Sequence, residues 1–425
     1  MAEYFHSIRL EEDKCKGCTN CIKKCPTGAI RVRNGKAKII ANRCIDCGEC
    51  VRVCPYRAKR AVTDTLDRFE EFKYKIALPA PSLYAQFSKE YTRGQILAAL
   101  RMMGFDYVYE VARAAELVTA ETKKYLARKD IEKPVISSAC PVVVRFIALK
   151  YPNLIDNVLP IEAPMEIAAQ IAKEEYTRKY NKNPKDVGVF FISPCAAKRT
   201  AVRSPLGSEK SSIDCVISIK SVYFALRRLL EEAKEVDFDI MASKYGVRWA
   251  NNGGESLALE NDNFIAVDGI HNVAKVLEEI ENERIQDIDF VEALACMGGC
   301  LGGLLCMENV YTAKTVLKKI LEKDVTQLAE PQKDEHYDPV LHNKIKDVDA
   351  YSFDKDMNKA MMKMNEMTKI IERLPGLDCG ACGSPNCITF AEDIVRGFAN
   401  EADCIVNLKE NYKSLLKMMM TKEEE

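Results

Sequence analysis

Between about residues 75 and 330, short apolar runs alternate with longer segments in which apolar residues recur every three or four positions. The short runs are typical of buried strands and the longer segments of amphipathic helices. Strand-like runs occur at 76–78, 107–109, 135–136, 187–192, 216–219, 264–267 and 290–291. Helix-like segments follow most of them, at 112–126, 163–179, 221–233 and 272–280. This alternation predicts an α/β fold with mostly parallel strands.

The pattern changes on both sides of this region. Near the N-terminus, Asn34-Gly35 separates two short apolar runs and predicts a β-hairpin, and residues 61–72 suggest a charged helix. Residues 331–352 are polar and indicate a linker. Apolar residues in 357–374 alternate at intervals of three and four, which predicts a helix that packs on its own body or, alternatively, dimerises. We therefore divide the chain into residues 1–62, 63–330, 331–373 and 374–425, the last of them small and mostly helical.

The composition of the chain limits the cellular compartment and the kinds of binding partner that we expect. The chain has 62 basic and 63 acidic residues, so it has no general attraction for nucleic acid or for a membrane surface. No apolar run approaches the roughly 20 residues of a membrane span, and the first ten residues resemble no export signal. We expect a cytoplasmic protein, in which 18 cysteines indicate metal ligation rather than disulfides.

Two cysteine runs near the N-terminus share the spacing Cys-x-x-Cys-x-x-Cys-x-x-x-Cys-Pro. In such runs, three sulfurs hold one cluster and the fourth reaches the other cluster. The spacing resembles that of bacterial two-cluster ferredoxins and does not fit a zinc ribbon or a disulfide framework. This predicts two [4Fe–4S] clusters, cluster one on Cys15, Cys18, Cys21 and Cys54, and cluster two on Cys44, Cys47, Cys50 and Cys25.

A further cysteine group lies near the C-terminus, at Cys379, Cys382, Cys387 and Cys404, with a predicted helix at 388–398. Gly380 and Gly383 would let backbone amides approach the sulfurs. The group resembles the small four-cysteine iron–sulfur domain of corrinoid iron–sulfur proteins and membrane electron-transfer complexes. It implies a third [4Fe–4S] cluster, with a zinc knuckle as the alternative.

Three cysteine segments in the middle of the chain follow predicted strands. Ligands of parallel sheets bind beyond the carboxyl ends of the strands, so these segments should meet. Their cysteines are Cys140, Cys195, Cys296 and Cys300, enough for one more cubane. Lys198 would place an ammonium near an anionic cofactor. Buried structural cysteines are the alternative.

These three segments, and their position after a ferredoxin domain, resemble the [FeFe]-hydrogenase family over about residues 1–310. The resemblance implies that the four central cysteines hold the [4Fe–4S] half of an H-cluster. Cys300 would also bridge to a diiron subcluster with CO, CN and a dithiolate bridge. Lys198 would donate a hydrogen bond to a cyanide, and Pro194 lies in the same loop. The implied reaction is 2H⁺ + 2e⁻ ⇌ H₂.

The sequence departs from the productive members of that family at the places that serve proton transfer. Ala139 stands where they have a second cysteine, which passes protons to the bridging amine. Other departures from family residues are Ser193 for a methionine, Ala201 for a glutamate and Leu294 for a methionine. Of a Glu-Ala-Thr-Glu run, matched to residues 113–116, only Glu116 is retained. A lost acid–base group typically costs about 10²–10⁴-fold in rate.

This pattern resembles the sensory or regulatory branch of the family. We expect slow interconversion of H₂ and protons, a redox partner (a ferredoxin or a signalling protein), hydrogenase maturation proteins as partners, and a homodimer as one arrangement. One alternative is a ferredoxin-linked catalytic hydrogenase with a rerouted proton path, in which Ser193 could act through a water. The other is a multi-cluster electron-transfer or scaffold protein without the diiron centre. Cys215 and Cys306 are expected to be buried small hydrophobes.

Overall fold

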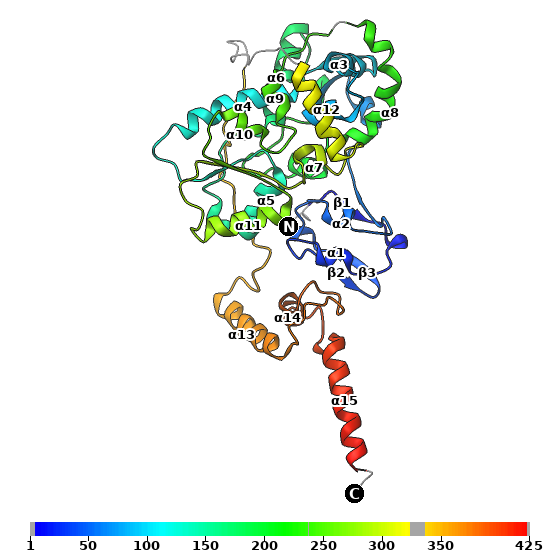
Figure 1. The fold of residues 1–425 in the computed structure, drawn as a ribbon, viewed down its shortest axis with the longest axis vertical. Helices are drawn as coiled ribbons and strands as arrows, with labels where there is room; N and C mark the ends of the chain where they lie inside the picture. The colour runs from blue at the N-terminus through cyan, green and yellow to red at the C-terminus, as the bar shows by residue number, and fades with distance from the viewer. Residues whose placement is uncertain (1–4, 237, 324–335, 423–425) are drawn as a thin grey trace.

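The computed structural model describes residues 5–236, 238–323 and 336–422 (Figure 1). A small N-terminal domain lies below a larger α/β body, and a helical C-terminal part lies against the N-terminal domain. The final helix projects away from the rest of the molecule. None of the described helices is both long enough and apolar enough to cross a membrane.

The N-terminal domain contains two antiparallel strand pairs. β1 (Ile8–Leu10) pairs with β4 (Lys59–Ala61), and β2 (Ile30–Arg33) pairs with β3 (Lys36–Ile39). The predicted hairpin is confirmed: Asn34 and Gly35 have φ of 51° and 71°, as a two-residue turn with positive φ at both positions requires. The short helices α1 (Asn20–Lys23) and α2 (Glu49–Arg52) lie within the two cysteine runs.

The charged helix predicted at residues 61–72 is wrong. Ala61 ends β4, and only Leu66–Glu71 forms a short 3₁₀ helix. Tertiary packing determines this segment, because the Phe69 ring lies 4.9 Å from the ring of Phe105 and 5.0 Å from that of Phe190. Leu66, Phe69 and Phe72 of this segment therefore pack against the hydrophobic core of the body.

The body is built on two sheets whose strands are all parallel, as predicted. The strand orders are β6-β5-β8-β9 and β10-β11-β7. The first sheet contains β5 (Tyr74–Pro79), β6 (Tyr107–Val108), β8 (Val187–Ser193) and β9 (Cys215–Ser218). The second contains β7 (Val135–Ile136), β10 (Phe264–Asp268) and β11 (Phe290–Leu294). Every strand-like run of the sequence forms one of these strands.

Helices surround the two sheets (Figure 1). They are α3 (Arg93–Met102), α4 (Val111–Leu126), α5 (Pro141–Lys150), α6 (Pro164–Tyr180), α7 (Ala196–Arg203), α8 (Ile219–Leu229), α9 (Lys244–Arg248), α10 (Gly254–Leu259), α11 (Ile270–Glu281) and α12 (Val310–Lys323). Cys140 and Cys195 are the N-cap residues of α5 and α7. The positive ends of two helix dipoles therefore lie where an anionic cluster would be bound.

The predicted linker packs on the body in its described part. Val340 forms a β-bridge with Ile161, and Ile345 and Ala350 are buried. The segment therefore belongs to the body rather than forming a free connection. Of the predicted linker, residues 331–335 lie outside the described part of the chain.

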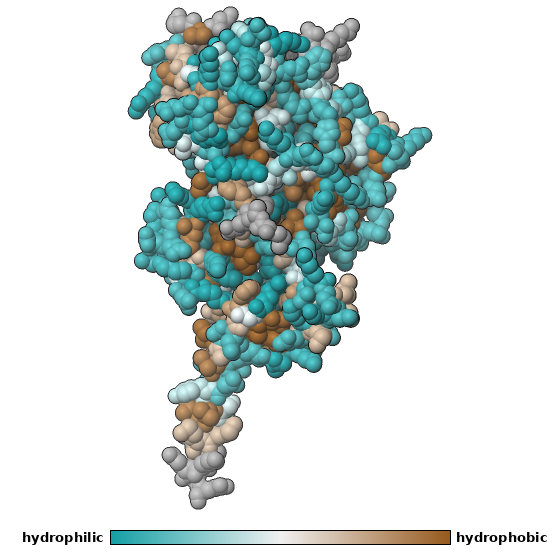
Figure 2. All heavy atoms as spheres, turned by 180° about the vertical axis from the view of Figure 1, so that it is seen from behind, coloured by the Kyte–Doolittle hydropathy of each residue, from teal (hydrophilic) through white to brown (hydrophobic). Residues whose placement is uncertain are grey.

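The C-terminal part contains α13 (Met357–Arg373), α14 (Cys387–Val395) and α15 (Ile405–Lys422). Ile370 and Leu374 pack against Phe390, but Met357 and Met364 are 75% and 60% exposed. The prediction that the whole stripe of 357–374 packs on its own body is thus wrong for its first half. Figure 2 shows apolar side chains on the projecting α15 as well. Its exposed apolar residues Ile405, Leu408, Tyr412 and Leu415 follow the same three–four spacing.

Candidate metal centre

Three strand ends meet at the centre of the body. β7, β8 and β11 lead into the three cysteine segments, and these segments line one cavity. Predicted site residues on its wall are Cys140, Cys195, Cys296, Cys300, Ala139, Pro194 and Lys198. The structure thus brings the four central sulfurs together beside Lys198. We call this space the central cavity.

The electrostatics of the central cavity suit the positively charged metal core of a cluster bound by thiolates. Burial, together with the neighbouring sulfurs, raises the pKa of Cys195, Cys296 and Cys300 to about 12. Thiolates are the metal-binding form of cysteine, so the site needs positive charge to hold them. The four sulfurs that line the cavity are the donor set of an iron–sulfur cubane. Only a few cations lie nearby in the part of the chain that the structure describes. The residues present therefore fit the [4Fe–4S] half of an H-cluster.

The third cysteine loop is tightly wrapped against the second. A Cβ atom at Gly303 would lie 2.4 Å from the Pro194 carbonyl oxygen, so only glycine permits this contact. Arg52 of α2 donates a hydrogen bond to the Gly302 carbonyl at 2.6 Å and lies 3.8 Å from Cys296 Sγ. The N-terminal domain therefore contacts the loop that carries Cys296 and Cys300.

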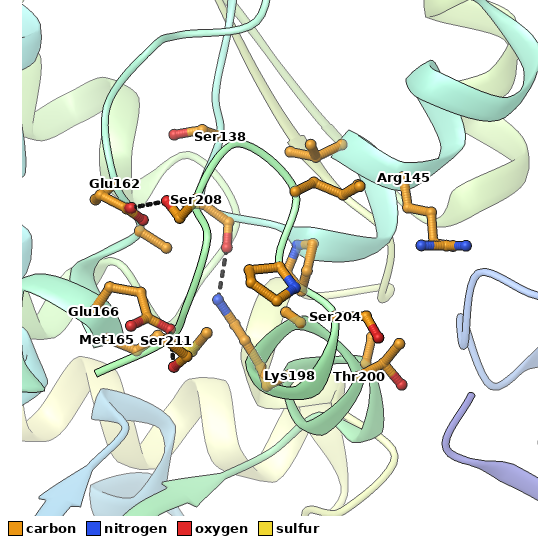
Figure 3. A pocket seen from close by; sticks show the side chains of 18 of the residues that line it. Ser138, Arg145, Glu162, Met165, Glu166, Lys198, Thr200, Ser204, Ser208 and Ser211 are labelled. Carbon is orange, nitrogen blue, oxygen red and sulfur yellow. Dashed lines mark hydrogen bonds between the residues drawn. The ribbon is translucent and has the colours of Figure 1, made fainter. Parts of the chain in front are cut away.

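Lys198 joins two of the loops. Its Nζ donates to the Ala139 carbonyl oxygen at 2.7 Å, and both residues lie between the central cavity and a second pocket (Figure 3). Glu162 and Glu166 line this second pocket, where their side chains are bonded to Ser208 and Ser211. Burial raises the pKa of both carboxyls.

Two residues proposed for proton transfer lie outside the central cavity. Ser193 Oγ donates to the Cys195 carbonyl at 3.0 Å and accepts from the Cys195 amide at 3.1 Å, so it shapes the loop. Glu116 accepts from the amide and hydroxyl of Ser243, each at 2.6 Å, and from Arg113 at 3.1 Å. The family pattern did not reveal that both polar groups are satisfied locally.

Sequence reasoning missed two carboxyls that do line the cavity, Glu255 and Glu292. Glu292 accepts from the amides of Gly253 and Ser256 at 2.8 and 2.9 Å and from Ser256 Oγ at 3.0 Å. Glu255 Oε2 accepts from Ser137 Oγ at 2.7 Å, while Oε1 has no hydrogen-bond partner within the described part of the chain. Glu292 lies inside the apolar run 290–294, and an acidic residue in a buried strand was a sign in the sequence of a functional role.

Burial raises the pKa of both carboxyls, and for Glu255 it does so well above the usual range. Three donors to Glu292 offset part of this rise, whereas among the described residues Ser137 is the only hydrogen-bond donor that lowers the pKa of Glu255. Ser137 Oγ, which holds Glu255, also accepts from the Ala139 amide at 3.2 Å. A buried carboxyl with a raised pKa therefore lies beside the loop that carries Ala139.

The cysteines of the N-terminal domain form two groups. Cys15, Cys18, Cys21 and Cys54 line one cavity, and Cys25, Cys44, Cys47 and Cys50 line the other. The second run contacts the central loops directly, because Asp46 is bonded to Thr200 of α7 and a Cβ at Gly48 would lie 3.0 Å from Leu304. The second group is thus the one beside the central cavity.

The C-terminal cysteines lie on and around α14. Cys382, Cys387 and Cys404 share one hydrophobic cluster, and Cys379 lies near enough to Cys382 to raise its pKa, although burial is the larger cause. The loop is docked on the N-terminal hairpin, where the Val32 amide donates to the Gly383 carbonyl at 2.8 Å. Cys215 and Cys306, by contrast, are buried in the hydrophobic core of the body.

Comparison with known families agrees with this arrangement. Residues 73–260 and 225–303 match the model of the iron only hydrogenase large subunit, C-terminal domain. Residues 7–55 match a 4Fe-4S dicluster domain, and residues 374–406 match a putative Fe-S cluster domain. The protein belongs to the iron-only hydrogenase family and carries iron–sulfur domains at both ends of the hydrogenase domain.

Individual relatives are distant. The periplasmic [Fe] hydrogenase large subunit of Nitratidesulfovibrio vulgaris is 29% identical over 52% of this chain and 58% of its own length. Iron hydrogenase 1 of Clostridium pasteurianum is 24% identical over 70% of this chain and 64% of its own length. The nuclear prelamin A recognition factor of Mus musculus is 22% identical over 52% of this chain and 60% of its own length. This chain thus spans less than two thirds of each relative.

A solved [FeFe]-hydrogenase from Chlamydomonas reinhardtii is 16% identical, with a TM-score of 0.48, and the match covers 65% of this chain and 95% of that one.

Proposed function

We propose that this protein binds an H-cluster in the central cavity and slowly interconverts H₂ with protons and electrons, in a sensory or regulatory role. The observation that carries the proposal is the gathering of Cys140, Cys195, Cys296 and Cys300 around one cavity beside Lys198. The two N-terminal clusters and a C-terminal [4Fe–4S] cluster would carry electrons to or from a redox partner, a ferredoxin or a signalling protein.

When bound, the diiron subcluster would supply the chemistry of the H–H bond. The chain supplies the surroundings. The four cysteines would hold the group, with Cys300 bridging its two halves. Lys198, whose ammonium reaches the cavity wall, would donate to a cyanide. The buried walls exclude bulk water and keep these electrostatic contacts strong.

Proton delivery is the step that the chain has altered. Ala139 offers neither donor nor acceptor, so it cannot relay a proton. Glu255 lies on the same cavity wall, burial raises its pKa well above the usual range, and one of its oxygens has no hydrogen-bond partner in the described structure. We infer that Glu255 delivers the proton, and that Glu292 recharges it. A route of two coupled buried carboxyls is consistent with slow turnover.

The proposal is tested by infrared spectroscopy and an iron count on protein matured with the diiron precursor. Bands of CO and CN⁻ that change under H₂ and under added CO are expected, with more iron than four cubanes contain. A cluster-carrying protein without the diiron centre is the competing function. It is favoured by the similarity to relatives named as prelamin A recognition and Fe-S cluster assembly factors. Iron at the level of four cubanes and no such bands would establish it instead.

Restoring the thiol in the first loop is expected to raise turnover. In the Ala139→Cys variant, a thiol stands where the family relays protons, and a positioned acid–base group contributes about 10²–10⁴-fold. The measurement is the specific rate of H₂ evolution by the matured protein. Ala115→Cys is the matched control, because it also adds a thiol to the cavity wall but on α4, away from the cysteine loops. Equal rates in all three proteins would show that proton delivery does not limit turnover.

A further inference from the structure

The cavities of the two N-terminal clusters have opposite charge. The charged residues that line the cavity of cluster one are Lys16 and Lys59, both basic. Those that line the cavity of cluster two are Asp46 and Glu49, both acidic. The cysteine runs themselves have the same spacing, so the difference comes from the residues between and after the sulfurs.

The cation at cluster one is buried in contact with a sulfur. Lys59 of β4 is only 3% exposed, and its Nζ lies 3.3 Å from Cys21 Sγ. Lys36 adds a second ammonium on the same side, because its Nζ donates to the Cys15 carbonyl at 3.0 Å. Cluster one is therefore held in a locally positive environment.

The anion at cluster two is equally well fixed. Asp46 is 4% exposed, and its Oδ1 lies 3.5 Å from Cys44 Sγ. Its carboxylate accepts from the amides of Ser7 and Ile8 at 3.0 Å each, and from the Thr200 hydroxyl of α7. The nearest cation along the chain, Arg43, is paired with Glu392 of α14.

Charge beside a cubane changes its reduction potential. Reduction adds one negative charge to the cluster, so a nearby ammonium stabilises the reduced state and a nearby carboxylate destabilises it. The effect is large when both charges are removed from water, because the local dielectric constant is low. Lys59 should raise the potential of cluster one, and Asp46 should lower the potential of cluster two.

We propose that the N-terminal domain is electrostatically graded, so that an electron placed on it resides on cluster one, the cluster farther from the central cavity. Cluster two lies beside that cavity, since Asp46 is bonded to Thr200 of α7, the helix that Cys195 caps, and a Cβ at Gly48 would lie 3.0 Å from Leu304. Electrons that reach cluster two from the centre are then drawn outward to cluster one. For the proposed hydrogen site, on which this last consequence rests, the grading favours H₂ oxidation over H₂ evolution.

The test is a potentiometric titration of the full chain followed by EPR, with protein assembled without the diiron subcluster. In this form the result does not depend on the proposed hydrogen function. Two ferredoxin-type reduction steps at separate potentials are expected. Lys59→Met should lower the upper step more than the lower one, because Lys59 contacts Cys21 but also acts on Cys50, while Asp46→Asn should raise the lower step. Two coincident steps in the parent, or a Lys59→Met variant that shifts the lower step as much as the upper one, would overturn the proposal.

Two further variants test whether the shift in reduction potential comes from the charge of Lys59 itself. Lys38→Met removes an exposed lysine of β3 that lines neither cavity, and it should shift neither step because solvent screens its charge. Lys59→Arg keeps the cation and should keep the upper step close to that of the parent. If Lys59→Met fails to assemble cluster one, as an iron count would show, the Asp46→Asn titration decides alone: an unchanged lower step contradicts the grading.

Discussion

Replacing Glu255 by glutamine is expected to lower the rate of H₂ evolution by the matured protein about 10²–10⁴-fold, the usual contribution of a positioned acid–base group. The variant keeps the size of the side chain and can still accept from Ser137 Oγ, which lies 2.7 Å from Glu255 Oε2. It removes the ionisable carboxyl, whose pKa burial raises well above the usual range. The infrared bands of the H-cluster should remain, since no cysteine ligand is changed.

A matched control is Glu166→Gln. Glu166 is another buried carboxyl with a raised pKa, and it is bonded to Ser211 Oγ at 2.7 Å, but it lines the second pocket rather than the central cavity. Its turnover should stay near that of the parent. The double variant gives a second check. When Ala139→Cys already supplies another proton relay, Glu255→Gln should lower turnover by a smaller factor than it does in the parent. A Glu255→Gln protein of full activity would exclude this carboxyl from the proton route.

Asp393→Ala is expected to undock the C-terminal domain and to cost about 3–5 kcal/mol of stability, the usual result of leaving buried cations unpaired. Asp393 is 2% exposed and accepts from Arg31 Nε at 2.6 Å, Arg33 Nη2 at 2.9 Å and Ser384 Oγ at 2.6 Å. Removing the carboxylate leaves two guanidinium groups facing each other at the junction with the β2–β3 hairpin. Denaturant unfolding measures the loss, and faster hydrogen exchange of Val32 would locate it.

Glu401→Ala provides the comparison. Glu401 also pairs with an arginine, Arg373, but both side chains are largely exposed. Solvent screens such a pair, so the unfolding midpoint should stay close to that of the parent. A similar loss in both variants would show that the effect of Asp393 comes from general damage to the domain rather than from the buried junction.

The grouping of the cysteines was predictable because the signal for it is local in the sequence. The spacing of the cysteines from Cys15 to Cys25 is by itself typical of an iron–sulfur cluster. The apolar runs before Cys140, Cys195 and Cys296 were sufficient to place these cysteines at strand ends. Parallel strands then bring the loops together without any knowledge of the side-chain packing. For the same reason, every strand of the body was found in the sequence.

The proposed proton route was not predictable from the sequence. It depends on how helices pack around the cavity, and not on the spacing of residues along the chain. Ser193 and Glu116 occupy family positions, but in the fold their polar atoms are used by Cys195 and Ser243. Glu255 begins a short helix after two glycines, and only the packing of α10 against β11 brings it to the cavity. The helix predicted at 61–72 failed similarly, since distant aromatic rings determine that segment.

The central cavity lies where the two sheets of the body meet. Cys140, Cys296 and Cys300 follow strands of the three-stranded sheet, whereas Cys195 follows β8 of the four-stranded sheet. A cluster bound by all four cysteines would therefore be a covalent cross-link between halves of the body that are also joined by the hydrogen bonds from Lys198 Nζ to the Ala139 carbonyl and from the Leu305 amide to the Pro194 carbonyl. Its binding free energy becomes folding free energy for the joined halves. Loss of the cluster would therefore lower the stability of the whole body where the two sheets meet, in addition to removing the cofactor.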